Sequence, residues 1–85
     1  MIDAIPPSIS PKQVRAARAW LNITQQQLAA MSLVNRKTIA DYERETSVPQ
    51  VRTLRDIQRS VEQLGIELIF EGQRGTGIVE KKAPG

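Results

Sequence analysis

The spacing of apolar positions changes along the chain and divides it into elements. From Gln50 to Leu64 apolar residues recur at intervals of three, three, four and three, which predicts an amphipathic helix that ends at Gly65. Pro49 suits the first turn of this helix. From Ile66 to Glu71 the interval changes to two, so a strand is expected, with a return strand at Ile78–Glu80 after a glycine-punctuated loop. An isolated hairpin is marginal in water, so it must pack on the helices or pair with another chain.

A first helix is predicted from Ser10 to about Leu21. Ser10 is a good N-cap residue, Pro11 suits the first helical position, and the Gln13 side chain can reach back to the cap. Asn22 tolerates the left-handed conformation that often follows a helix. The inward stripe of this helix consists of Val14, Ala17, Arg18 and Leu21.

Between these helices, Thr24–Arg44 has the pattern of two short helices joined by a tight turn. Thr24 caps the first helix with Gln27 completing a capping box, and Asn35 caps the second. The residues expected to face inward are Leu28, Ala29, Ile39 and Tyr42, with Val34 at the turn. The residues expected to face outward together are Gln25, Arg36, Lys37, Thr38 and Asp41. Such a polar cluster on a rigid helix pair is what reading DNA through the major groove requires.

Arg18 is a charged residue on an otherwise apolar stripe. A buried charge without a partner is costly, and Glu43, one turn after Ile39 on the inward side of its helix, is the candidate partner. The alternative is that Arg18 extends its guanidinium to solvent. Trp20, the only tryptophan, is expected to pack against the protein and not to contact a ligand.

The predicted elements indicate one domain with short flanking segments. Residues 1–9 contain Pro6–Pro7 and no helical period, which predicts an arm or a loosely packed lead-in. Residues 10–64 form the helical part, residues 65–82 the strand or hairpin, and residues 83–85 a flexible tail. The expected fold class is therefore mainly α, with four helices followed by a C-terminal β-strand or hairpin.

Composition narrows the possible functions. The 85 residues are enough for one small domain, and no apolar run approaches the roughly 20 residues of a membrane span. A net charge of +3 fits a nucleic-acid partner without selecting one. The chain has no cysteine and no histidine, so we expect no enzymatic activity, no metal and no other cofactor. No signal peptide is visible, and a cytoplasmic, nucleoid-associated location is expected.

The spacing of several motifs is similar to that of a known family. The motif residues are Arg18, Thr24–Gln25, Leu28–Ala29, Val34–Ile39, Tyr42–Arg44 and Pro49. With these residues, the segment from about Val14 to Leu64 resembles the Cro/C1-type helix-turn-helix family, also called the Xre family, of bacterial and phage regulators. The resemblance implies a lambda-repressor-like domain in which the arginine of the first helix, Arg18, pairs with the glutamate that ends the recognition helix, Glu43.

The resemblance also implies roles for the exposed residues. Base edges are expected to meet Asn35, Arg36, Lys37 and Asp41. Phosphates are expected to meet Gln25, Thr38 and Arg44, with a thymine methyl as the alternative contact for Thr38. Arg52 is expected to meet phosphate because it lies near the N-terminus of the last helix, where free backbone N–H groups help. Arg36 can bind guanine through two hydrogen bonds. Asp41 is four residues after Lys37, and orienting that lysine is favoured for Asp41 over accepting from a cytosine. For Arg55 and Arg59 a solvated face is favoured over the alternative of a phosphate contact.

The chain departs from the family pattern at two glycine positions. Leu33 stands where the turn between the two helices usually has glycine, which suggests a reshaped or longer turn. Glu45 stands where a glycine usually follows the recognition helix, so this helix is expected to run on or end differently. The predicted strand pair takes the place of a fifth helix.

The preferred function is a sequence-specific transcriptional regulator that binds double-stranded DNA as a homodimer. The expected dimer contacts are Ile66, Leu68, Phe70 and Ile78, together with the outer face of the last helix. The alternative for the hairpin is that it covers only its own core. The alternative function is an antitoxin that neutralises a toxin and regulates its own operon, and a regulatory protein is a further possible partner. A helix-turn-helix used only as a protein adaptor is disfavoured by the exposed Arg36–Lys37.

Overall fold

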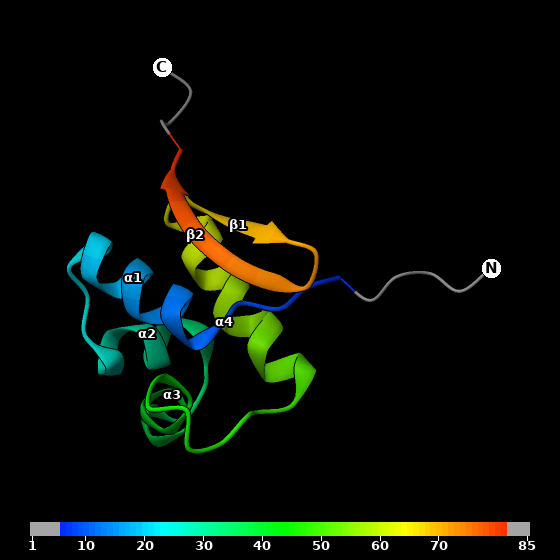
Figure 1. Ribbon diagram of the computed structural model, residues 1–85. Coiled ribbons are helices and arrows are strands. Elements are labelled where there is room, and N and C mark those ends of the chain that lie inside the picture. The colour runs from blue at the N-terminus through cyan, green and yellow to red at the C-terminus, as the bar shows by residue number, and fades with distance from the viewer. Residues whose placement is uncertain (1–5, 82–85) are drawn as a thin grey trace.

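Four helices precede a two-stranded antiparallel hairpin in the computed structural model, which describes residues 6–81 (Figure 1). The elements are α1 (Pro11–Leu21), α2 (Gln25–Ser32), α3 (Arg36–Glu43), α4 (Val51–Gln63), β1 (Ile66–Glu71) and β2 (Arg74–Glu80). This order confirms the predicted fold class. The expected tail at residues 83–85, the last residue of the 65–82 segment and residues 1–5 of the arm lie outside the described residues.

Local capping sets both ends of α1. The Ser10 side chain accepts a hydrogen bond from the Gln13 backbone N–H at 3.1 Å, and the Gln13 Oε1 accepts one from the Ser10 N–H at 2.9 Å. Asn22 ends the helix in the left-handed conformation, with φ 58°. The buried stripe of α1 is centred on Val14 and Ala17. Trp20 is 60% exposed, so the prediction that it packs is wrong: it lies at the edge of the stripe in the last turn.

The segment before α1 is part of the core, contrary to the expected loose lead-in. Ile9 is fully buried, and its carbonyl oxygen accepts a hydrogen bond from the Tyr42 hydroxyl at 2.6 Å. Its backbone N–H donates to Gln58 Oε1 at 3.2 Å. Ile9 and Val14, which is also fully buried, occupy the two positions that form a hydrophobic staple around a helix N-terminus. The core therefore extends to residue 9.

The hydrophobic core lies among the four helices and under the inner face of the hairpin, which packs on α1 and α4. Its buried members are Ile9, Val14, Ala17, Leu28, Ala29, Ile39, Tyr42, Leu54, Ile57, Val61, Ile66 and Leu68. Val34, in the turn after α2, is half-buried and packs against this cluster, as predicted. None of the helices in residues 6–81 is long and apolar enough to cross a membrane.

The last helix is shorter than its apolar pattern. Gln50 is the N-cap residue of α4, so Pro49 precedes the cap and does not occupy the first turn. The Gln50 side chain makes no capping hydrogen bond. Val51 and Leu64, expected on the inward face, are 53% and 39% exposed because the core covers only the middle turns. Gly65 then adopts φ +95° and turns the chain into β1, as predicted.

The hairpin is longer than expected. β2 begins at Arg74 and not at Ile78, and Gly75 and Gly77 lie within the strand instead of in the loop. Gly72, with φ 62°, forms the tight connection between the strands. The register shifts between Ile69 and its neighbour, so that one residue of β2 bulges out of the pairing.

Gln13 attaches the hairpin to α1. Its side chain is almost fully buried, and its Nε2 donates to the carbonyl oxygens of Ile69 at 2.9 Å and Gly77 at 3.0 Å. A Cβ atom at Gly75 would lie 2.1 Å from Gln13 Oε1. This contact explains why a glycine occupies an interior position of β2.

The inner face of the hairpin packs on α1 and α4, which argues against the expected dimer contacts at Ile66 and Leu68. Ile66 and Leu68 are only 1% and 8% exposed and belong to the core, while Phe70 and Ile78 are half-buried against it. The strand period places these side chains on one face, and that face packs on the protein's own helices. A second chain could reach Ile66 or Leu68 only by unpacking the core. On the outer face, the hydrophobic residues at the surface are Ile69 and Val79.

Candidate nucleic-acid interface

The helix pair at residues 25–43 is fixed at each helix start by side-chain caps. Thr24 and Gln27 form a reciprocal capping box, with hydrogen bonds of 3.0 and 2.8 Å. Asn35 caps α3 by accepting from the Lys37 backbone N–H at 2.8 Å. These short-range contacts satisfy free N–H groups at the helix starts and set where α3 begins.

The turn between α2 and α3 keeps a left-handed residue although that residue is not glycine. Leu33 has φ 57° and ψ 40°, and the Val34 N–H donates to the Ala29 carbonyl at 3.0 Å. The expectation of a reshaped turn is wrong, because Leu33 adopts the conformation itself. A branched side chain in this region costs roughly 1–2 kcal/mol, and Leu33 is 93% exposed, so packing does not offset the cost.

The end of α3 is also followed by a left-handed residue that is not glycine. The helix stops at Glu43, and Glu45 adopts φ 63°. The Glu45 N–H donates to the Tyr42 carbonyl at 2.9 Å, and the Thr46 N–H donates to the Asp41 carbonyl at 2.9 Å. The helix therefore does not run on, and Glu45 takes the conformation that glycine would otherwise supply.

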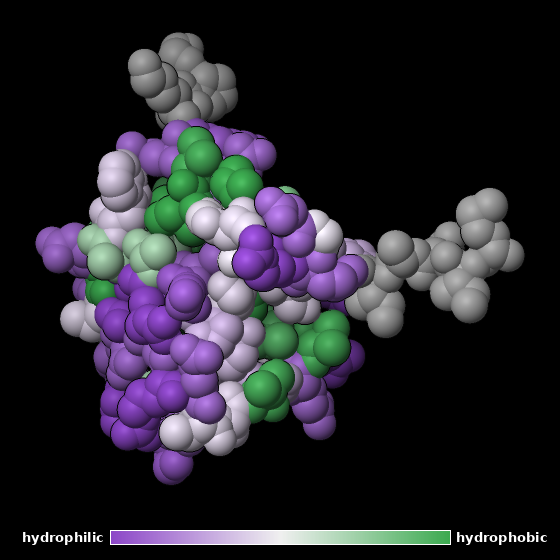
Figure 2. Space-filling model, in the orientation of Figure 1, coloured by the Kyte–Doolittle hydropathy of each residue, from purple (hydrophilic) through white to green (hydrophobic). Residues whose placement is uncertain are grey.

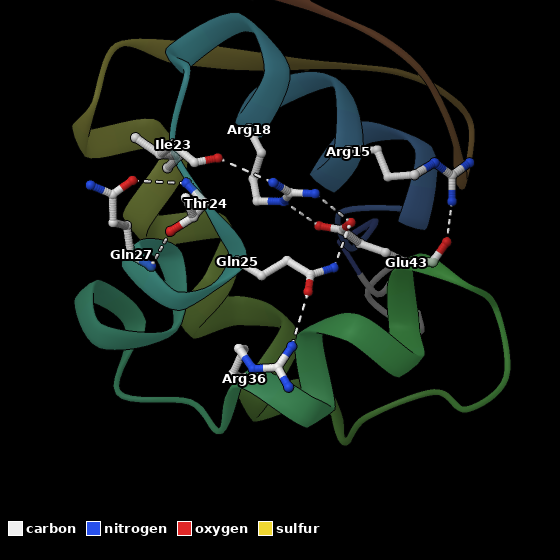
Figure 3. A network of polar contacts seen from close by, with 8 residues as sticks. All are labelled: Arg15, Arg18, Ile23, Thr24, Gln25, Gln27, Arg36 and Glu43. Carbon is white, nitrogen blue, oxygen red and sulfur yellow. Dashed lines mark hydrogen bonds and ion pairs between the residues drawn. The ribbon is translucent and has the colours of Figure 1, made fainter.

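A bidentate ion pair between Arg18 and Glu43 joins the C-terminal end of α3 to α1 (Figure 3). Arg18 Nε lies 2.5 Å from Glu43 Oε2, and Arg18 Nη2 lies 2.8 Å from Glu43 Oε1. Arg18 Nη1 also donates to the Ile23 carbonyl at 3.1 Å. The Glu43 side chain is 5% exposed and the Arg18 side chain 22%. The pair is thus largely removed from water and sets the position of α3 against α1.

The charges of this pair stabilise each other. Burial tends to raise the pKa of Glu43, but hydrogen bonds from Arg18 and Gln25, with the charges of Arg18 and Arg15, bring the pKa below its ordinary value. The hydrogen bond to Glu43 raises the pKa of Arg18. Both groups are therefore charged at neutral pH.

Arg15 also belongs to this network, although it was not among the residues predicted from the sequence. Its Nη1 donates to the Glu43 backbone carbonyl (Figure 3). The same nitrogen lies 3.7 Å from Glu45 Oε2. A cation beside the last carbonyls of a helix interacts favourably with the helix dipole. The available signal was its spacing: Arg15 is three residues before Arg18 and so lies on the same side of α1.

Gln25 links the buried pair to the exposed start of α3. Its Nε2 donates to Glu43 Oε1 at 3.1 Å, and its Oε1 accepts from Arg36 Nη1 at 3.4 Å (Figure 3). Gln25, expected to contact phosphate, thus has its amide engaged within the protein. Arg36 is exposed beside it and has donors free for another acceptor.

The remaining expected contact residues divide into two groups. Asn35, Arg36 and Lys37 are exposed at the start of α3, and Thr38 is half-buried behind them. Further along α3, the carboxylate of Asp41 binds two cations, Lys37 and Arg44. A shallow surface groove is lined by Gln25, Arg36, Lys37, Ala40 and Arg44.

Arg52 stands apart from this group. It is exposed in the first turn of α4, and within residues 6–81 no hydrogen bond or ion pair joins it to the groove. The described part of the chain also contains no group of three or more acidic side chains that could hold a metal ion. The side chains gathered at α3 are hydrogen-bond donors and cations, which suit the acceptor-rich edges and phosphates of a nucleic acid.

Comparison with protein families agrees with this geometry. A helix-turn-helix family model matches residues 14–60, which extend from α1 to most of α4 and make up more than half of the 85 residues. No match was found among curated protein sequences.

Proposed function

The chain belongs to the Cro/C1-type (Xre) helix-turn-helix family of DNA-binding, non-enzymatic domains, and on this premise we propose that it is a sequence-specific transcriptional regulator. In this proposal α3 enters the major groove of double-stranded DNA with its N-terminal end foremost. The observation that carries the proposal is that α3 is anchored by Arg18–Glu43 while Arg36 and Lys37 stay exposed at its start.

Base reading is assigned to the start of α3. Arg36 would bind guanine O6 and N7 through two donors, and Lys37 would donate to a neighbouring acceptor. Asn35, which caps the helix through its Oδ1, keeps its amide donors for a base edge. Asp41 is the remaining residue expected at the bases, and its two ion pairs favour the alternative role of orienting Lys37.

Phosphate contacts are assigned to the residues around this reading surface. Arg44 lies at the far end of α3, and Thr38 lies one turn after its cap. Gln25 could donate to a phosphate through the second N–H of its Nε2, since Nε2 makes one hydrogen bond, to Glu43. Arg52 would add a contact from the first turn of α4, where free backbone N–H groups also favour an anion.

We further propose a homodimer, because a two-fold protein matches a near-palindromic operator. With Ile66 and Leu68 in the core, the contact surface is assigned to the outer face of the hairpin, which exposes Ile69 and Val79. Figure 2 shows hydrophobic residues at the surface over the hairpin. A two-stranded sheet also has edge strands whose backbone groups can pair with another chain.

The reading assignment is tested with single alanine variants on duplex DNA selected from a random pool. Arg36→Ala and Lys37→Ala should each weaken binding to the selected duplex by about 1–3 kcal/mol. Arg59→Ala, which removes an exposed cation on the third turn of α4, is the matched control and should bind as the parent does. Unchanged affinity and selectivity in both α3 variants would rule out the assignment.

A further inference from the structure

Asp41 binds two cations that come from opposite ends of α3. Lys37 Nζ lies 2.9 Å from Asp41 Oδ2, and Arg44 Nη2 lies 2.7 Å from Asp41 Oδ1. Each carboxylate oxygen therefore takes one cation. The Asp41 side chain is only 18% exposed, whereas the side chains of Lys37 and Arg44 are 78% and 69% exposed. The carboxylate lies beneath the two cations that it holds.

The three residues form a line along one side of α3, and the outer two, Lys37 and Arg44, reach the groove. Positions four before and three after Asp41 share its helix face, and Lys37 and Arg44 both line the groove beside Gln25 and Arg36. From Lys37 to Arg44 the helix rises about 10 Å, at roughly 1.5 Å per residue. One carboxylate thus restrains cations along most of the helix.

The negative charge of Asp41 lowers the net positive charge on this side of α3. The other carboxylate of α3, Glu43, is buried and paired with Arg18, so it faces away from the groove. Hydrogen bonds from Lys37 and then Arg44 hold the pKa of Asp41 below its ordinary value, so the carboxylate is ionised at neutral pH. Asp41 therefore cancels one of the two positive charges that it orients.

We propose that Asp41 is a positioning residue that sets specificity: it holds Lys37 and Arg44 in fixed directions and limits binding through phosphates alone. This inference rests on the proposed DNA-reading function of α3. Binding to non-cognate DNA depends on the number of phosphates that cations neutralise. Binding to a cognate site depends also on donors held in the correct geometry. Asp41 lowers the contribution of phosphate neutralisation and maintains the geometry of the donors.

The test compares the parent with Asp41→Asn, which removes the charge and keeps the shape. A duplex is selected from a random pool with each protein, and affinities for that duplex and for a scrambled duplex are measured over a range of salt concentrations. Asp56→Asn on α4 is the control, since it changes the net charge equally and Asp56 holds neither Lys37 nor Arg44.

In Asp41→Asn, affinity for the scrambled duplex should rise and its dependence on log salt should steepen by about 0.9, the value for one additional phosphate. If the two proteins bind the scrambled duplex equally at 1 M salt, Asp41→Asn should bind it up to about eightfold more tightly than the parent at 0.1 M salt. The selected sequence should stay the same, while the ratio of cognate to scrambled affinity falls. Asp56→Asn should keep the parent ratio.

Two results would overturn the inference while leaving the proposed function standing. One is a ratio and salt dependence in Asp41→Asn equal to those of the parent. The other is a change in the selected base at one position, which would mean that Asp41 itself reads a base, for example by accepting from cytosine N4. Failure of the parent to select any duplex would instead reject the proposed function, and this inference with it.

Discussion

Arg18 on α1 and Glu43 at the end of α3 meet through two parallel hydrogen bonds of 2.5 and 2.8 Å. The contact joins residues 25 positions apart and fixes the recognition helix to the first helix. Because Glu43 is almost fully buried, removing Arg18 would leave a carboxylate with only weaker partners in a poorly hydrated position.

Arg18→Met should therefore destabilise the domain by about 3 kcal/mol, the lower end of the loss expected when one partner of a buried pair is removed. The free energy of unfolding in urea measures this loss. The double variant Arg18→Met with Glu43→Met should recover part of it, because no unpaired charge remains. If the single and double variants were equally unstable, the pair would not be the source of the effect.

Stability should also fall in acid because of Glu43. Its pKa is lower in the folded chain than in the unfolded chain, so the folded state binds fewer protons. The contribution of the pair is therefore fully present above the unfolded value, near pH 4.5, and is lost as the pH falls through the folded value. Urea midpoints measured from pH 7 down to pH 3 should decline less in Glu43→Gln than in the parent, and parallel curves would contradict this.

Leu33→Gly should stabilise the protein. Leu33 is 93% exposed and has φ 57°, so glycine would remove backbone strain without removing packing. The expected gain relative to Leu33→Ala is about 1 kcal/mol, since alanine keeps the Cβ atom that causes the strain. Thermal or urea unfolding of the two variants measures the difference, and alanine as stable as glycine would show that the turn is unstrained.

Two glycines of β2 should respond very differently to alanine. At Gly75 a Cβ would lie 2.1 Å from Gln13 Oε1, whereas at Gly77 it would meet nothing within 4 Å. Gly75→Ala should displace the buried Gln13 amide from its three partners and cost about 1–3 kcal/mol. Gly77→Ala should be nearly neutral. Equal stability of the two variants would show that Gln13 does not hold the hairpin.

The local signals in the sequence were sufficient for much of the fold. The capping boxes at Ser10–Gln13 and Thr24–Gln27 and the N-cap at Asn35 predicted where α1, α2 and α3 begin, because caps depend on neighbouring residues. The cost of burying an unpaired guanidinium made Glu43 the candidate partner of Arg18, and the family resemblance favoured the pair. The structure contains that contact.

Features set by distant contacts were missed. β2 starts at Arg74 because Gly75 lies over Gln13, whose partners on the two strands are 56 and 64 residues away in the chain. The alternation of β1 showed that Ile66 and Leu68 share a face but not which surface that face would cover. Leu33 and Glu45 keep left-handed conformations because the packed helix pair holds them there, which residue preferences alone do not indicate.

α3 is proposed to read DNA sequence from its exposed start, and selection of bound duplexes from a random pool tests this role. The parent should enrich one sequence with inverted half-sites whose centres are about 34 Å, or one helical turn, apart. A variant carrying both Arg36→Ala and Lys37→Ala should enrich no such sequence, although it keeps the Arg18–Glu43 pair and hence the fold. A parent pool that stays random, or the same enriched sequence in the variant, would contradict the claim.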